Sequence, residues 1–520
     1  MEKFHIADVP KTDRITHLVD NLYAKMPVIE SARAKLITES YKATEGQPVI
    51  TRRAEAFAHI LRNIPIIIRD NELIVGSSTI APRGCQTFPE FSYQWLEDEL
   101  DTVATRTADP FYISEQAKAD LREVHKYWKG KTTSELATSY MAPEAILAID
   151  HNIFTPGNYF YNGVGHVTVK YEEVLAIGYE GIIAKAQKEL DECNVGDGDY
   201  AKKSRFLEAV IMSCQAVIDY AHRYAELAEQ MAYQCQDPTR KQELLQIASN
   251  CTRVPAKGAR NFYEACQSFW FVQQLIQMES SGHSISPGRF DQYMYPYYKS
   301  DMEAGNLTRE FAQELMDCIW VKLNDLNKCR DAASAEGFAG YSLFQNLIVG
   351  GQNKDGEDMT NDLSFMCIEA SMHVHLPAPS LSIRVWNGSP HDLLIKAAEL
   401  TRTVFVNDDV APELNVSELK KTSYKQGDAV ELPSYTASDN LGVCTVDVIL
   451  ILPNSELRLL SHDENGSVTY YTKNTDLYLS SFGVSDTSFC AEQTGRYVLR
   501  FVAYDDIYNR TVVELPFDVK

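Results

Sequence analysis

Hydrophobic and polar residues alternate in two different patterns along the chain. Up to about Arg402, apolar side chains recur three or four positions apart, the spacing of one helical face. This spacing predicts helices over residues 16–25, 29–41, 52–61, 114–128, 133–140, 171–190, 203–232, 238–247, 262–278, 306–324 and 390–402. Short apolar runs at 72–77, 341–353 and 380–386 predict buried strands. We therefore expect a large α/β domain in which helices surround a central barrel-like sheet.

The second pattern begins after Arg402, where helical spacing ends and short alternating strands take its place. The predicted strands are 429–432, 446–452, 456–460, 468–471, 477–479, 497–503 and 511–517. Strands at this spacing, separated by turn residues, predict an immunoglobulin-like β-sandwich over residues 413–520, after a junction at 403–412. Cys444 and Cys490 could pair across the two sheets, or each could be buried singly.

Composition narrows the choice of partners and compartment. The chain has 520 residues and a formal net charge of -23 at pH 7, which argues against a nucleic-acid or anionic-membrane partner. No apolar run is long enough to span a membrane, and we expect no signal peptide. The 11 cysteines lack zinc-ligand spacing, so we expect reduced thiols and no metal site. The first domain is predicted to be cytoplasmic, although sandwich modules are more usual at cell surfaces.

Two histidine-bearing loops carry the candidate chemistry. His283 and Ser284 follow the apolar helix 262–278, at a point where Gly282 breaks the helical pattern. His166 ends a turn in which two glycines flank Val164. An imidazole beside a hydroxyl suits hydrogen bonding to a small polyol, and glycines let the backbone approach a ligand closely. The alternative is that both loops are structural turns whose polar groups satisfy the backbone.

Both loops belong to longer stretches with a recognisable pattern. These are TEGQP (44–48), GKTTSELATSYM (130–141), YNGVGHV (161–167), GHSISP (282–287), RFDQYMYPYY (289–298), QNLIVGGQN (345–353) and PSLS (379–382). In them, the chain up to about Arg402 resembles the N-terminal half of a glycyl radical enzyme of the pyruvate formate-lyase superfamily. The resemblance is strongest to the B12-independent glycerol and 1,2-propanediol dehydratases.

This resemblance implies a fold and a reaction. The fold would be a ten-stranded α/β barrel of two antiparallel five-strand halves, of which residues 1–402 would form an incomplete half. The reaction would convert a small diol to an aldehyde and water. It requires a glycyl radical installed by a separate S-adenosylmethionine and iron–sulfur activase, so we expect no cofactor bound by the chain itself. Members of the family are expected to be homodimers.

The same resemblance implies roles for four residues. His166, His283 and Ser284 would bind the substrate hydroxyls and transfer protons, and Tyr341 would line the same site. A quaternary ammonium substrate such as choline would favour an aromatic cage instead. The pairing of histidine and serine therefore favours a diol.

The chain departs from the family pattern after Arg402. The family continues into a Gly-Cys-Val-Glu loop, which supplies the thiyl cysteine, and ends in an Arg-Val-Ala-Gly-Tyr segment, which carries the radical glycine. Residues 442–447 and 500–504 are only faintly similar, because Cys444 is wrongly spaced and Ala503 is no glycine. We therefore predict no catalytic residues and no dehydratase activity in this chain alone.

Two further interpretations remain open. The chain could be a non-catalytic binding or structural protein in which a half-barrel carries an adhesion-type sandwich. Alternatively it could be an artefactual chimera, joined within residues 403–413 by recombination or by faulty assembly of sequence reads.

Overall fold

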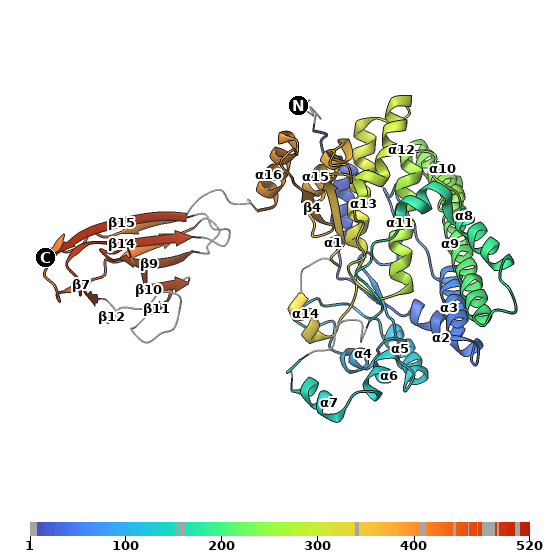
Figure 1. Cartoon of the computed structure of the whole chain (residues 1–520), viewed down its shortest axis with the longest axis horizontal. Helices are drawn as coiled ribbons and strands as arrows, with labels where there is room; N and C mark the ends of the chain where they lie inside the picture. Colours follow the sequence, from blue (N-terminus) through green and yellow to red (C-terminus); the bar gives the residue numbers. More distant parts are fainter. Residues whose placement is uncertain are drawn as a thin grey trace. The chain divides into compact units, whose positions relative to one another are not determined.

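The computed structural model divides the chain into two compact units, Met1–Leu400 and Thr401–Lys520. The structure describes residues 8–151, 153–154, 162–338, 343–405, 412–439, 444–455, 457–464, 466–470, 484–485, 488–504 and 510–520. Figure 1 shows the helical first unit and the β-rich second unit.

Helices make up most of the first unit. They are α1 (Asp13–Tyr23), α2 (Ala32–Ala43), α3 (Val49–Asn63), α4 (Gln94–Glu99), α5 (Glu115–Trp128), α6 (Thr133–Ser139), α7 (Pro143–Asp150), α8 (Tyr171–Asp191), α9 (Tyr200–Gln234), α10 (Pro238–Arg253), α11 (Phe262–Glu279), α12 (Phe290–Ala304), α13 (Arg309–Asp325), α14 (Ala332–Phe338), α15 (Asp362–Val374) and α16 (His391–Phe405). Each predicted helix is present, with its ends shifted by a few residues, because amphipathic spacing is a local property of the sequence.

Short parallel strands form a curled partial sheet inside these helices. Strand β1 (Ile29–Glu30) pairs with β2 (Cys85–Gln86), and β3 (Asn346–Gly350) pairs with β4 (Ser380–Arg384). Two isolated bridges extend the second pair, from Gly288 to Leu347 and from Val167 to Ile285. The predicted strands at 341–353 and 380–386 are thus confirmed within shorter limits.

The strand predicted at residues 72–77 does not form. Leu73, Ile74 and Val75 are buried as expected, but side chains take the hydrogen bonds that a neighbouring strand would make. The Gln267 amide accepts from the Val75 N–H at 2.9 Å and donates to its carbonyl at 2.7 Å. The apolar run therefore predicted the burial of these residues correctly, but its prediction of a strand was wrong.

Helix α11 is the centre of the first unit and is buried on every side. Phe262, Phe269 and Trp270 pack into one hydrophobic core, whereas Phe271 and Leu275 pack into another. Figure 1 shows α11 between α13 and the paired helices α8 and α9. Because α11 ends at Glu279, this buried helix sets the position of the loop that carries His283.

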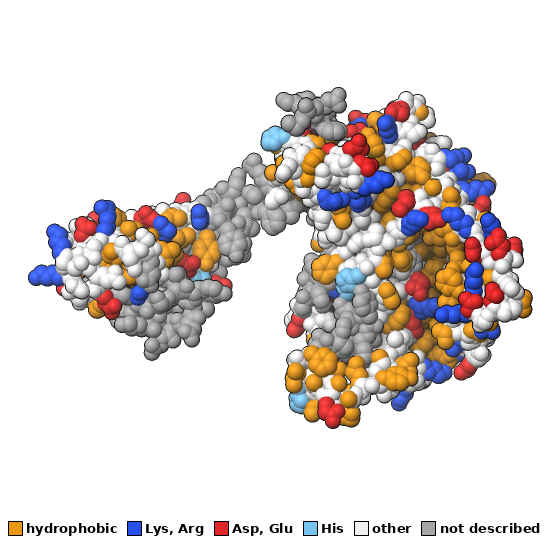
Figure 2. All heavy atoms as spheres, in the orientation of Figure 1, with side chains coloured by type: hydrophobic (Ala, Val, Ile, Leu, Met, Phe, Trp, Pro, Cys, Tyr) orange, Lys and Arg blue, Asp and Glu red, His pale blue; other side chains and the backbone are white. Residues whose placement is uncertain are grey.

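An apolar surface patch covers α6 and α7 at the lower edge of the first unit (Figure 2). Its large exposed side chains are Leu136, Tyr140, Leu147, Ile153 and Phe154. Exposed apolar groups gathered in this way favour association. Among the helices described, none combines the length and the apolar character needed to cross a bilayer.

The second unit is built from β-strands. A six-stranded sheet has the order β11-β10-β9-β14-β15-β6, and smaller sheets have the orders β12-β13-β7 and β5-β8. The strands are β5 (Glu413–Val416), β6 (Ser423–Tyr424), β7 (Ala429–Glu431), β8 (Tyr435–Ser438), β9 (Thr445–Ile451), β10 (Leu457–Glu464), β11 (Ser467–Tyr470), β12 (Val484–Ser485), β13 (Ser488–Cys490), β14 (Gly495–Tyr504) and β15 (Arg510–Val519).

Six of the seven strands predicted after Arg402 are present, and residues 477–479 lie outside the described residues. No disulfide joins Cys444 to Cys490, so the pairing considered from the sequence is not formed. The immunoglobulin-like type of this unit stays a prediction.

Candidate functional site

The two predicted histidines lie against each other. The His166 N–H donates to the His283 carbonyl at 2.8 Å, and the imidazole centroids are 4.8 Å apart at an interplanar angle of 69°. Just after the two histidines, Val167 and Ile285 form a parallel bridge. Two loops far apart in the sequence therefore cross and bring both imidazoles into one place.

Glycines permit this crossing. A Cβ on Gly282 would lie 1.8 Å from the Val164 oxygen, and a Cβ on Gly165 would lie 2.1 Å from the His283 oxygen. Neither contact is possible without separating the two backbones. Close approach of one loop to the other, rather than flexibility, explains why these positions are glycine.

Both sides of the crossing contain backbone in the left-handed region. The φ angles are +53° at His166 and +59° at Ser284, which is uncommon for residues other than glycine. The Ser284 N–H donates to the Leu343 carbonyl at 2.8 Å. His283 and Ser284 are buried, whereas the His166 side chain is exposed. Hydrogen bonds to neighbouring segments hold both bends in place.

Tyr341, the fourth predicted site residue, lies outside the described residues. The described chain resumes beside it, and the Phe344 ring centroid lies 6.2 Å from that of His283. Phe344 was not among the predicted site residues, because a single aromatic in an apolar run carries no signal of its own.

The surroundings of His283 keep its imidazole uncharged at neutral pH. Burial lowers the pKa of His283 to about 4, and the nearby Arg330, His166 and Lys328 add to this effect. A neutral imidazole has one donor and one acceptor nitrogen, so it can exchange hydrogen bonds with a hydroxyl in either direction. Sequence reasoning also missed Lys328, whose Nζ donates to the Gly282 carbonyl.

A buried ion cluster fixes the start of the His283 loop. Arg33 is fully buried, and its Nε donates to the Met278 carbonyl, in the last turn of α11, at 2.8 Å. Glu90 pairs with Arg33 at 2.7 Å and with Arg53 at 3.1 Å. Burial alone would raise the pKa of Glu90, but the two guanidinium groups lower it below its ordinary value. Cations clamped on the α11 C-terminus also complement the helix dipole.

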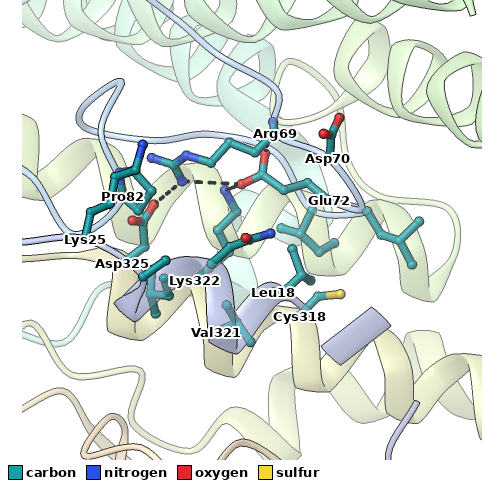
Figure 3. A pocket seen from close by; sticks show the side chains of 15 residues that line it. Leu18, Lys25, Arg69, Asp70, Glu72, Pro82, Cys318, Val321, Lys322 and Asp325 are labelled. Carbon is teal, nitrogen blue, oxygen red and sulfur yellow. Dashed lines mark hydrogen bonds and ion pairs between the residues drawn. The ribbon is translucent and has the colours of Figure 1, made fainter. Parts of the chain in front are cut away.

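A cavity of about 280 Å³ lies elsewhere in the first unit, and neither His166 nor His283 lines it (Figure 3). Its walls are largely apolar, and four charged side chains meet at one side. Arg69 pairs with Asp325 at 2.7 Å, and Lys322 pairs with Glu72. Because these charges satisfy one another, the cluster is a structural ion network rather than a site for a charged ligand.

The comparison with known proteins decides the family. A family model described as pyruvate formate lyase-like matches residues 9–432, beyond the limit at Arg402 expected from the motifs. The chain belongs to this family.

Relatives of this pyruvate formate lyase-like chain include two solved structures. One concerns 1,2-propanediol dehydration in Roseburia inulinivorans, with 70% identity, a TM-score of 0.75 and coverage of 76% of this chain and 47% of that chain. The other is the glycerol-bound B12-independent glycerol dehydratase from Clostridium butyricum, with 55% identity, a TM-score of 0.75 and coverage of 77% and 50%.

A curated relative is the (2S)-3-sulfopropanediol dehydratase of Klebsiella oxytoca, 35% identical over 384 residues, which cover 72% of this chain and 46% of the relative. The chain therefore spans about half the length of the relatives it matches. The relatives include several dehydratases, and one similar solved structure is described as a glycyl radical enzyme from Archaeoglobus fulgidus.

The two stretches with faint similarity to radical segments lie in the second unit, beyond residue 432. Ala503 is buried in β14 and is paired with Val446 on one side and Thr511 on the other. Cys444 directly precedes β9. These residues do not fit a glycyl radical site. Such a site needs a glycine, and position 503 is an alanine whose methyl group is buried in the sheet. Within the described residues, no three His, Cys, Asp or Glu side chains are grouped to hold a metal ion.

Proposed function

We propose that the first unit is the diol-binding half of a glycyl radical dehydratase acting on 1,2-propanediol or glycerol. The observation that carries the proposal is the crossing of the His166 and His283 loops, with Ser284 held in a left-handed bend beside them. Relatives described for 1,2-propanediol dehydration and for glycerol support the substrate class. The higher identity to the former, 70% against 55%, favours 1,2-propanediol.

Each residue has a physical role in this proposal. The neutral imidazole of His283 accepts a hydrogen bond from one substrate hydroxyl and donates to another oxygen. The Ser284 hydroxyl adds a second polar contact from the next position of the same rigid loop. His166 approaches from the other loop and supplies a proton to the hydroxyl that leaves. Holding a diol between fixed groups removes most of the orientational entropy of the reaction.

The radical chemistry itself lies outside these residues. A glycyl radical, installed by a separate activase, would supply the hydrogen abstraction. We propose that this chain by itself does not dehydrate diols and that it requires polypeptide carrying the Gly-Cys-Val-Glu and glycine segments. The corresponding assay is anaerobic incubation with a family activase, followed by electron paramagnetic resonance. A doublet glycyl signal with aldehyde formation would contradict this part of the proposal.

Diol binding is the direct test of the site. Saturation-transfer NMR on the purified chain should show 1,2-propanediol and glycerol binding, and His283→Gln or His166→Gln should weaken it about tenfold. His17→Gln is the matched control, because His17 is an exposed histidine of α1. Equal binding by all three variants would show that the histidine pair is not the site. No binding by the unsubstituted chain would favour the non-catalytic interpretation instead.

The remaining partners are proposed from the family. They are a radical activase and a second copy of the chain, in the cytoplasm. A genuine fusion with an adhesion-type unit and an artefactual chimera are the two alternative interpretations of the chain. Amplifying and sequencing source DNA across the codons for residues 393–432 would distinguish them.

A further inference from the structure

Lys328 lies beneath the His283 loop and belongs to none of the motifs in the sequence. We propose that Lys328 is a positioning residue, whose ammonium holds the peptide between Gly282 and His283, keeps the His283 imidazole oriented and places a positive charge beside it. The inference rests on the proposed function, because it assigns a task at the same site.

The backbone around His283 is held at three successive points. The Lys328 ammonium donates to the Gly282 carbonyl, which precedes His283. The His283 carbonyl accepts from the His166 N–H at 2.8 Å, and the Ser284 N–H donates to the Leu343 carbonyl at 2.8 Å. Of these three contacts, only the one from Lys328 is made by a side chain. A substitution can therefore remove it without changing the chain path elsewhere.

The partner of this ammonium is unusual for a lysine inside a protein. Across the described part of the chain, no carboxylate lies within ion-pair distance of Lys328. Lys322, six positions earlier, shows the ordinary arrangement, since it binds both the Glu72 carboxylate and the Gly76 carbonyl. A cation held only by a carbonyl keeps its positive field, whereas a carboxylate would neutralise it. That field acts on the neighbouring imidazole.

The Lys328 side chain is half-buried. Lys328 lines two cavities, one of about 20 Å³ with Asn162 and Ser281, and one of about 10 Å³ with Gln86 and Gln277. Cavities of this size hold about one water molecule each, so the water beside the ammonium is confined and screens its charge only in part.

Lys328 and His283 change their charge at different pH values. Burial and Arg330 lower the pKa of Lys328 to about 7. The pKa of His283 is about 4, lowered by burial and by Arg330, His166 and Lys328. Between these values Lys328 is charged and His283 is neutral. As pH rises through about 7, Lys328 loses its proton and its effect on His283 fades.

Histidine NMR on the full chain tests the proposal. With ¹³Cε1-labelled histidine, the His283 signal is assigned as the one lost in H283Q. In K328Q and K328M the pKa of His283 should rise toward its ordinary value, whereas K328R, which keeps the charge, should leave it low. Binding of 1,2-propanediol should weaken about tenfold in K328M and recover in K328R, because a charge-assisted hydrogen bond is lost and then restored.

The matched control is K126Q, since the Lys126 side chain is 72% exposed on α5 and should leave the pKa of His283 unchanged. An unchanged His283 pKa in K328Q, or an equal rise in K328R, would overturn the proposal. Should the variants not fold, the unsubstituted chain still decides. Its His283 signal should show a second, small step near pH 7, and the absence of that step would equally overturn the proposal.

These readouts also separate the two proposals. If the unsubstituted chain binds no diol but the His283 pKa still responds to Lys328, the proposed function fails and the positioning role stands. If the unsubstituted chain binds diol but the His283 pKa does not respond to Lys328, the proposed function stands and the positioning role fails.

Discussion

Replacing Gly282 by alanine would force apart the two loops that carry the histidines. The added Cβ would lie 1.8 Å from the Val164 oxygen and 2.2 Å from its carbonyl carbon. Real Cβ contacts stay beyond 3.0 Å, so the two backbones would have to separate along this line. Gly282→Ala should therefore disturb the site without touching either imidazole.

The expected loss of stability has two parts. Overpacking a close-packed interior costs up to about 3 kcal/mol. Separating the loops also lengthens the 2.8 Å hydrogen bond from His166 to His283, which contributes about 1 kcal/mol. We expect the free energy of unfolding of the first unit to fall by up to about 4 kcal/mol.

Urea unfolding followed by tryptophan fluorescence measures this loss. All 5 tryptophans lie in the first unit, so the signal is not mixed with that of the second unit. Gly198→Ala is the matched control, because a Cβ there meets nothing within 4 Å. It should change the free energy of unfolding by less than about 0.5 kcal/mol.

A second glycine makes the prediction sharper. Gly165→Ala pushes apart the same two loops, with its Cβ 2.1 Å from the His283 oxygen. Once the loops have separated, the second methyl group has room, so the double variant should lose clearly less than the sum of the two single losses. Strict additivity, or a Gly282→Ala chain as stable as Gly198→Ala, would refute the close crossing.

Two other predictions concern the surroundings of the site and the second unit. Glu90→Gln leaves Arg33 buried without its carboxylate partner, and the first unit should lose about 3–5 kcal/mol, against almost nothing for the exposed Glu123→Gln. Because the pKa of Glu90 is lowered in the folded chain, its stabilising effect is complete above its ordinary value of 4.5 and disappears as pH falls through the lowered value. Glu90→Gln should remove the loss of stability that protonation of Glu90 causes at low pH. If the free energy of unfolding falls with decreasing pH as in the unsubstituted chain, this role of Glu90 is contradicted. Separately, the fragment 412–520 should melt cooperatively on its own by circular dichroism, since its core draws only on residues after Leu400. Failure to fold would show that it depends on the first unit.

Much of the architecture could be predicted from the sequence. The helices of the first unit and the strands of the second follow from the spacing of apolar residues, which is a local property. The two loops with His166 and His283 could be singled out because glycines beside a histidine are a local signal as well. Uninterrupted stretches such as GHSISP and YNGVGHV point to the family by their residues alone.

Only the tertiary structure decided which residues meet. It placed His166 against His283, showed that glycines allow the crossing, and brought Lys328 to the carbonyl beside them. It also showed that residues 72–77, where a strand was expected, form a loop whose backbone is hydrogen-bonded to the Gln267 side chain. The physical reason is common to all of these: periodicity states which side chains are buried, whereas a hydrogen-bond partner distant in sequence is chosen by packing.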